Sequence, residues 1–132
     1  MEQTVEELKA AVPFKDTTET GDVVLMLNET EDPKMPVAAA FAAITGFDRD
    51  MTKRDEWWHV HFAFLTIPPT PKSIILQPDH FTGQEIFTMG GKKVFIKALD
   101  LDALRPGPEE PEGETPEEAK EKRRGGLRIV KG

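Results

Sequence analysis

The sequence has no cysteine, and this absence removes several kinds of chemistry at once. Without thiols the chain forms no disulfide, offers no thiolate to a metal and has no thiol nucleophile. Serine is almost as scarce, because Ser73 is the only one and it stands outside any G-x-S-x-G motif. The glycine pairs at 90–91 and 125–126 lack the Lys and Ser or Thr of a phosphate-binding loop. We therefore expect a protein that is not an enzyme.

Long apolar runs and an excess of basic charge are also missing. The longest uninterrupted apolar segment covers residues 37–44, far short of the roughly 20 residues that span a bilayer. The acidic N-terminus lacks the basic start and apolar centre of a secretory signal. Acidic residues outnumber basic ones, 24 to 17, so the whole chain is repelled by phosphate backbones and anionic membranes. These features predict a cytoplasmic protein with no membrane partner.

The first segment, residues 1–20, predicts a short helix and a linker. Thr4 and Glu7 have the spacing of a capping box, in which each side chain bonds the other residue's backbone N–H at a helix start. The apolar residues that follow share one helical face, and Pro13 ends the pattern. Isolated helices below about 12 to 15 residues are marginal in water. This helix must therefore dock on the rest of the protein.

From Gly21 onward, short apolar runs alternate with Gly, Pro, Asp and Asn, which is typical of an all-β domain. The Ala-rich run at 37–47 suits a helix by propensity, but the Pro36 start and the break at Thr45-Gly46 favour a strand. The predicted strands are 23–27, 37–47, 56–67, 73–77, 85–89 and 92–98.

The strand at 56–67 alternates between two faces. Trp58, Val60, Phe62 and Phe64 share one face, which we assign to the core. The pair Gly90-Gly91 predicts a tight β-hairpin, because both residues accept positive φ. Its expected inward residues are Phe87, Met89, Val94 and Ile96. A sheet this small hides its apolar face and its edges by closing, so residues 21–105 predict a small antiparallel SH3-like barrel.

The segment 106–132 has a different composition. Residues 106–121 hold seven Glu and four Pro without an aromatic residue, which predicts disorder. Basic residues follow, chiefly Lys122, Arg123, Arg124 and Arg128. Once those seven Glu and the six basic residues of the tail are set aside, residues 1–105 keep 17 acidic and 11 basic side chains. A nucleic acid is therefore expected to bind only through the C-terminal tail.

Several stretches of the middle segment also resemble a known family. They are Gly21-Asp22-Val23-Val24, WWHVHFAFLTIPP at 57–69, SIIL at 73–76 and the EIFTMGG segment at 85–91. Over residues 21–99 the chain is similar to a family of short, uncharacterised bacterial proteins. The resemblance implies a small SH3-like β-barrel and no particular activity or ligand. The Ala-rich second run and the long tail depart from the family, which puts a shared ligand in doubt.

The strongest candidate for chemistry is the pair His59 and His61. Residues two apart on a strand point the same way, so both imidazoles lie within reach of one ion. With His80 as a third ligand they form the pattern of an open zinc site or another divalent transition-metal site. The alternative is that the two histidines simply face solvent on a strand with an aromatic inner face.

The leading interpretation is a binding module rather than a metal protein. Trp57 is on the face opposite the core, and an exposed Trp is a frequent anchor for a partner protein because its rigid ring gives contact area at low entropic cost. Its alternative is cover by another part of the chain or by a second subunit. We expect a non-enzymatic, cofactor-free module that binds protein through Trp57, His59 and His61, or that associates with itself.

Overall fold

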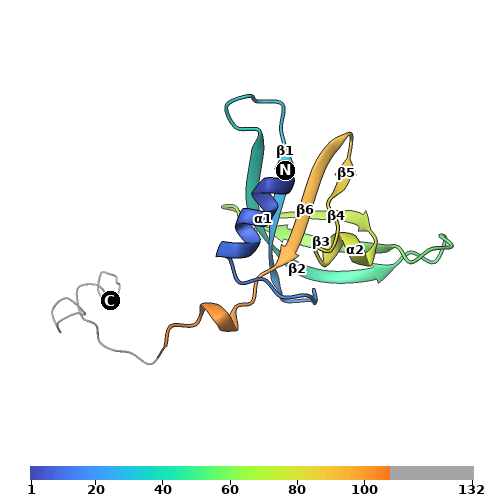
Figure 1. Cartoon of the computed structure of the whole chain (residues 1–132). Coiled ribbons are helices and arrows are strands. Elements are labelled where there is room, and N and C mark those ends of the chain that lie inside the picture. The colour runs from blue at the N-terminus through green and yellow to red at the C-terminus, as the bar shows by residue number, and fades with distance from the viewer. Residues whose placement is uncertain (108–132) are drawn as a thin grey trace, which may run out of the picture.

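A computed structural model describes residues 1–107, and it confirms the mainly β, barrel-like fold (Figure 1). The elements are α1 (Glu2–Ala11), β1 (Val23–Glu29), β2 (Val37–Arg49), β3 (Trp58–Phe64), β4 (Thr70–Leu76), α2 (Pro78–Phe81), β5 (Phe87–Met89), β6 (Lys92–Ala98) and the 3₁₀ turn η1 (Asp102–Leu104). The six strands form one antiparallel sheet in the order β4-β3-β2-β1-β6-β5. Its two edges, β4 and β5, do not pair with each other, so the sheet is a curled half-barrel.

The Ala-rich segment is a strand, as predicted, and it is the longest in the sheet. The first part of β2 pairs with β1 and its second part with β3, so the strand belongs to two ladders at once. The predicted break at Thr45-Gly46 is instead a β-bulge, because the register against β3 shifts between Ile44 and Gly46 and the strand continues to Arg49. Pairing on both sides outweighs the helical propensity of alanine, which amounts to less than about 1 kcal/mol per residue.

The main core lies on the concave face of the sheet. The predicted inward face of β3 is confirmed, because Val60 and Phe62 are fully buried while Trp58 and Phe64 pack at its margin. The hairpin at Gly90-Gly91 is also confirmed, with φ of 60° and 81° at the two glycines. Of its expected inward residues, Phe87, Val94 and Ile96 are buried, whereas Met89 is 38% exposed. Met89 is the last residue of the edge strand β5, where the sheet no longer covers it.

A second, smaller core covers the opposite face of the sheet. Helix α1 lies against β1 and β6 in Figure 1, and its Val5 is buried with Leu25, Leu27 and Phe95. The helix therefore docks, as its short length requires. It begins at Glu2, however, and Met1 is its N-cap without a side-chain bond, so the predicted capping box at Thr4 is wrong. Burial of Val5 holds the helix on the sheet, and no side-chain cap contributes to its N-terminus.

Helix α2 was not expected from the sequence. It follows β4 directly, with Pro78 in its first turn and Gln77 as its N-cap. It lies in the connection between the two edge strands and contacts β6, so it spans the open side of the half-barrel. Its last residue, Phe81, is buried in the main core. Within residues 1–107, no helix combines the length and the apolar character needed to cross a membrane.

Candidate functional site

A cavity of about 290 Å³ opens beside α2, at the margin of the main core. We call it the aromatic pocket. Four separate segments supply its walls, namely the loop before β1, the end of β2, the start of β3 and α2. The lining residues are Thr18, Phe47, Glu56, Trp58, Pro78 and Phe81. Most of this surface is carbon. The pocket therefore suits a ligand group that is apolar or that stacks on aromatic rings, rather than one that needs many hydrogen bonds.

Three aromatic rings from three elements meet in this pocket. The ring centroids of Phe47 and Trp58 are 6.3 Å apart, with planes at 87°. Those of Phe47 and Phe81 are 5.1 Å apart, with planes at 54°. Inclined rings present both faces and edges to the cavity beside them, and the edge-to-face contact of Phe47 with Trp58 is a favourable arrangement, while Phe47 and Phe81 are tilted. Because Phe47 and Trp58 are only partly buried, their rings remain open to a ligand.

Two polar residues accompany the indole of Trp58. Its Nε1 donates a hydrogen bond to Glu56 Oε2 at 2.9 Å, which holds the carboxylate at the rim of the pocket. The guanidinium of Arg49 lies 5.8 Å from the centroid of the same ring. Arg49 does not line the cavity, so it approaches the indole without filling the pocket. The indole is thus hydrogen-bonded to the Glu56 carboxylate and lies near the Arg49 guanidinium.

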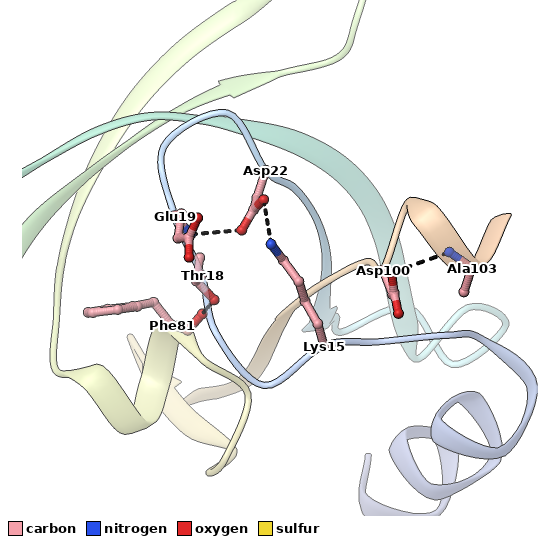
Figure 2. Close-up of polar contacts among 7 residues, drawn as sticks. All are labelled: Lys15, Thr18, Glu19, Asp22, Phe81, Asp100 and Ala103. Atoms are coloured by element: carbon pink, nitrogen blue, oxygen red, sulfur yellow. Dashed lines mark hydrogen bonds and ion pairs between the residues drawn. The ribbon is translucent and has the colours of Figure 1, made fainter. Parts of the chain in front are cut away.

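Figure 2 shows how the loop before β1 is held against α2. The Thr18 hydroxyl donates a hydrogen bond to the carbonyl oxygen of Phe81 at 2.7 Å, and both residues line the pocket. The carboxylate of Asp22 accepts a hydrogen bond from the Glu19 N–H at 2.7 Å and pairs with Lys15 Nζ at 2.8 Å. This bond to Asp22 raises the pKa of Lys15. The loop is therefore braced at two points, which fixes one wall of the pocket.

The same view contains the end of the described chain. Asp100 Oδ1 accepts a hydrogen bond from the Ala103 N–H at 3.3 Å, next to the short turn η1. The nearby Asp102 pairs with Arg105 instead, at 3.6 Å. These acidic residues therefore act in local structure, outside the lining of the aromatic pocket.

His59 and His61 lie on the opposite face of the sheet from the pocket, since their neighbours Val60 and Phe62 point into the main core. Each has its own carboxylate. His59 Nε2 is 3.3 Å from Asp50 Oδ2, and His61 Nε2 is 2.7 Å from Asp48 Oδ2. The two imidazoles therefore take part in two separate contacts.

Asp50 is the more buried of the two carboxylates, with a side chain that is 10% exposed. The Thr52 hydroxyl donates to its Oδ1 at 2.6 Å and the Thr52 N–H donates at 3.0 Å. These hydrogen bonds lower the pKa of Asp50, and the nearby His59 adds a smaller contribution in the same direction. The carboxylate thereby organises the turn that leads out of β2.

His61 also joins the only serine of the chain to an acid. Its Nδ1 lies 2.6 Å from Ser73 Oγ, across the β3–β4 ladder, and its Nε2 lies 2.7 Å from Asp48 Oδ2. A serine, an imidazole and a carboxylate in a row are the parts of an acyl-transfer site. The row lies on the outer face of the sheet, and it lines neither the aromatic pocket nor the second cavity described below. A row of this kind also needs donors aimed at a developing oxyanion before it can act as an acyl-transfer site.

His80 is located on α2, away from the other two histidines. Its ring stacks on Phe87 with centroids 4.6 Å apart, and its Nδ1 accepts a hydrogen bond from the Gln77 N–H at 3.3 Å. Its Nε2 is 3.5 Å from Glu85 Oε1. In the part of the chain that the structure describes, no three His, Asp or Glu side chains gather as a metal site would require. The expected trio of histidines is thus not brought together.

Trp57 is half-buried, and the edge of its ring contacts His80, with centroids 6.1 Å apart. His80 therefore covers part of the Trp57 ring, and the role of Trp57 as an anchor stays a prediction. Trp58, assigned to the core from the strand pattern, is the tryptophan that reaches the pocket. The third aromatic wall, Phe81, depends on α2 and was not visible in the sequence.

A second cavity, of about 340 Å³, separates α1 from the segment after α2. Its lining combines acidic, basic and apolar residues, namely Glu2, Val5, Glu6, Lys9, Gly83, Gln84, Glu85, Ile86 and Phe95.

The predicted basic patch of Lys122, Arg123, Arg124 and Arg128 lies outside the described residues.

No protein-family model matches the chain, and neither the curated proteins nor the solved structures contain a match. The resemblance to a bacterial β-barrel family accordingly stays a prediction from the sequence.

Proposed function

We propose that this protein is a non-enzymatic binding module and that the aromatic pocket receives one side chain of a partner protein. The observation that supports this most strongly is the convergence of Phe47, Trp58 and Phe81 around a solvent-accessible cavity. Clustered aromatic residues in a preformed pocket are typical of the central contacts of protein interfaces. The braced loop around Thr18 keeps the pocket shaped before a partner arrives.

The proposed site differs from the one expected from the sequence. Trp57 is half-buried with the edge of its ring against His80, and His59 and His61 are engaged with carboxylates on the outer face. Trp58 has a ring open to the cavity and an acidic neighbour at the rim. We therefore assign the contact with protein to the Trp58 side of β3.

A selection of phage-displayed random peptides against the whole chain tests the proposal. We expect an enriched consensus that is lost when Thr18→Met fills the mouth of the pocket. Thr18→Val serves as the matched control, because both variants lose the hydroxyl bond to Phe81 that braces the loop and only Thr18→Met adds volume. A selection that yields no consensus, or one that survives Thr18→Met unchanged, contradicts the proposal.

The metal alternative has its own test, although the geometry favours it less. Calorimetric titration with zinc compares the wild type with the double variant His59→Ala, His61→Ala. We expect no stoichiometric binding, because each imidazole lies beside a different carboxylate and His80 is elsewhere. One equivalent bound with micromolar affinity, and lost in the double variant, would restore the metal-binding hypothesis.

The tail alternative rests on charge alone. A salt-dependent mobility shift with single-stranded oligonucleotides compares the wild type with a variant whose four tail residues Lys122, Arg123, Arg124 and Arg128 are changed to Gln. We expect weak binding that falls steeply with salt and disappears in the variant, since residues 1–105 are acidic overall. Binding that persists in the variant would move the nucleic-acid contact to the folded part.

A further inference from the structure

We propose that the side chain received by the aromatic pocket is an arginine of a basic segment in the partner protein. This inference rests on the proposed function and specifies its ligand. It follows from the combination of three rings and one carboxylate in a cavity of about 290 Å³, a volume at the small end of ligand sites. Such a space takes a single side chain rather than a large cofactor.

The rings set the first requirement on the ligand. The π-face of an aromatic ring is electron-rich, so a cation placed within about 6 Å of the centroid is attracted, most strongly by Trp. Phe47 and Phe81 stand at an angle of 54° to each other, and Phe47 and Trp58 at 87°, so a group in the cavity beside these contacting rings meets more than one of them. An apolar side chain also fits these walls, but it leaves the carboxylate at the rim unused.

Glu56 sets the second requirement. Its Oε2 accepts the hydrogen bond of the Trp58 indole at 2.9 Å, which positions the carboxylate beside the ring that best attracts a cation. A carboxylate accepts several hydrogen bonds, so capacity for a guanidinium remains after the indole is bound. The Thr18 hydroxyl, whose hydrogen goes to the Phe81 carbonyl, keeps a lone pair as a further acceptor on the lining.

The structure already contains a contact between an arginine and the Trp58 ring. The Arg49 guanidinium lies 5.8 Å from the centroid of Trp58, and the two residues are cross-strand partners in the β2–β3 ladder. Because Arg49 is not part of the cavity lining, a second guanidinium can approach the indole from the pocket. The Trp58 ring therefore already has a guanidinium within cation–π distance.

Arginine fits these walls better than lysine. A guanidinium is planar, weakly hydrated and able to stack on a ring while it pairs with a carboxylate. An ammonium is strongly hydrated and presents three donors, and the pocket lining offers mostly carbon to them. The excess of acidic over basic side chains in residues 1–105, 17 to 11, also favours the approach of a basic segment.

The test uses the full chain and three short peptides, Ac-Gly-Gly-Xaa-Gly-Gly-amide with Xaa as arginine, citrulline or lysine. Citrulline keeps the shape of arginine and removes its charge. Binding is followed through the indole N–H resonance of Trp58, which is distinguished from that of Trp57 by the variant Trp57→Phe. We expect saturable shifts with arginine, and affinity about tenfold lower with citrulline, which corresponds to about 1.4 kcal/mol. The lysine peptide should lie between them.

A pair of matched variants tests whether the Glu56 charge contributes to the affinity for the arginine peptide. Glu56→Gln keeps an acceptor for the indole and removes the charge, so we expect arginine affinity to fall about fivefold. Asp55→Asn removes a neighbouring exposed charge outside the pocket lining, and we expect a change below about twofold. Equal losses in both variants would mean that general acidity, and not the pocket, attracts the peptide, which overturns the inference.

The remaining outcomes separate this inference from the proposed function. Equal affinity for the arginine and citrulline peptides, or no shift with any peptide, overturns the choice of arginine, while the peptide selection still decides whether the pocket binds protein. A variant with Arg123→Gln, Arg124→Gln and Arg128→Gln identifies a competing occupant. If arginine peptides bind this variant more tightly than the wild type, the chain's own tail fills the pocket, and the assignment to a partner is wrong.

Discussion

The indole Nε1 of Trp58 donates a hydrogen bond to Glu56 Oε2 at 2.9 Å, and this contact joins the core to the rim of the aromatic pocket. The Trp58 ring packs at the margin of the main core, whereas Glu56 is exposed. The bond therefore fixes which way the indole points into the cavity. It also keeps a negative charge next to the three rings, which is the basis of the proposed selectivity for arginine.

We predict that Glu56→Ala lowers the free energy of unfolding by about 0.5 to 1 kcal/mol, because a solvent-accessible hydrogen bond to a carboxylate is lost. Urea denaturation followed by tryptophan fluorescence measures the change. Asp55→Ala is the matched control, and it should stay within about 0.5 kcal/mol of the wild type. Equal stability of Glu56→Ala and the wild type would show that the indole holds its position without the bond.

Gly83 should be the least replaceable glycine in the described chain. Its φ is +78°, and an added Cβ would lie 2.6 Å from Lys97 Cγ and 2.8 Å from the backbone oxygen of Ile96. Gly83→Ala should therefore lower the free energy of unfolding by about 3 kcal/mol, from backbone strain and overpacking together. Gly21→Ala is the control, because its φ of +97° carries strain while no atom lies within 4 Å. It should cost about 1 to 2 kcal/mol, and equal losses would refute the role of close packing.

The contact of Asp50 with Thr52 predicts a pH dependence of stability. Because hydrogen bonds from Thr52 hold the pKa of Asp50 below its unfolded value of about 3.9, the folded state is favoured when Asp50 is ionised. This contribution is complete above that unfolded value and disappears as the pH falls through the folded pKa. Thr52→Val should therefore be less stable at pH 7 and converge with the wild type in acid.

Thermal unfolding between pH 2.5 and 7 measures this convergence. Thr66→Val is the matched control, since the Thr66 hydroxyl donates to the Pro68 carbonyl and not to a carboxylate. Its stability difference from the wild type should be the same at every pH. A Thr52→Val curve that runs parallel to the wild type would mean that Asp50 keeps its low pKa without Thr52.

Val5 should hold α1 on the sheet. The side chain is 3% exposed and packs with Leu25, Leu27 and Phe95. Val5→Ala removes two buried methyl groups, so we expect the free energy of unfolding to fall by about 2 kcal/mol. Chemical denaturation measures the loss, and the exposed Glu6→Ala on the same helix should change it by less than about 0.5 kcal/mol. Similar effects of the two variants would place α1 outside the cooperative unit.

The row of Ser73, His61 and Asp48 should be catalytically silent. It lies on the outer face of the sheet and lines neither of the two cavities described above, so neither cavity holds an acyl substrate beside Ser73. We expect a fluorophosphonate probe to leave Ser73 unlabelled, as judged by intact mass. Stoichiometric labelling that His61→Ala abolishes would show an activated serine, and the protein would then have to be regarded as a hydrolase candidate.

The sequence predicted the sheet well, since strand faces are a local property. Alternation along residues 58–64 identified the inward set because side chains on neighbouring positions of a strand point to opposite faces. The glycine pair at 90–91 located the hairpin for an equally local reason. The cap at Thr4 was a poorer guide, because the helix begins at Glu2 and its N-cap makes no side-chain hydrogen bond.

The candidate site was predicted only in part. His59, His61 and Trp57 were correctly placed on or near one strand, but their neighbours were not foreseeable. Each histidine meets a carboxylate contributed by β2 or by the turn that follows it, and those contacts depend on the register after the bulge at Gly46. His80 is held by α2, a four-residue helix whose short length leaves no periodic signal in the sequence.

By itself the sequence determined that residues 21–105 form a mainly β domain, that the chain has no thiol chemistry and that its folded part is acidic. These properties depend on composition and on patterns within single segments. Only the tertiary structure decided that Phe47, Trp58 and Phe81 share one cavity with Glu56. They come from three elements separated along the chain, and their meeting depends on how far the sheet curls and on where α2 crosses its open side, neither of which is encoded in a local pattern.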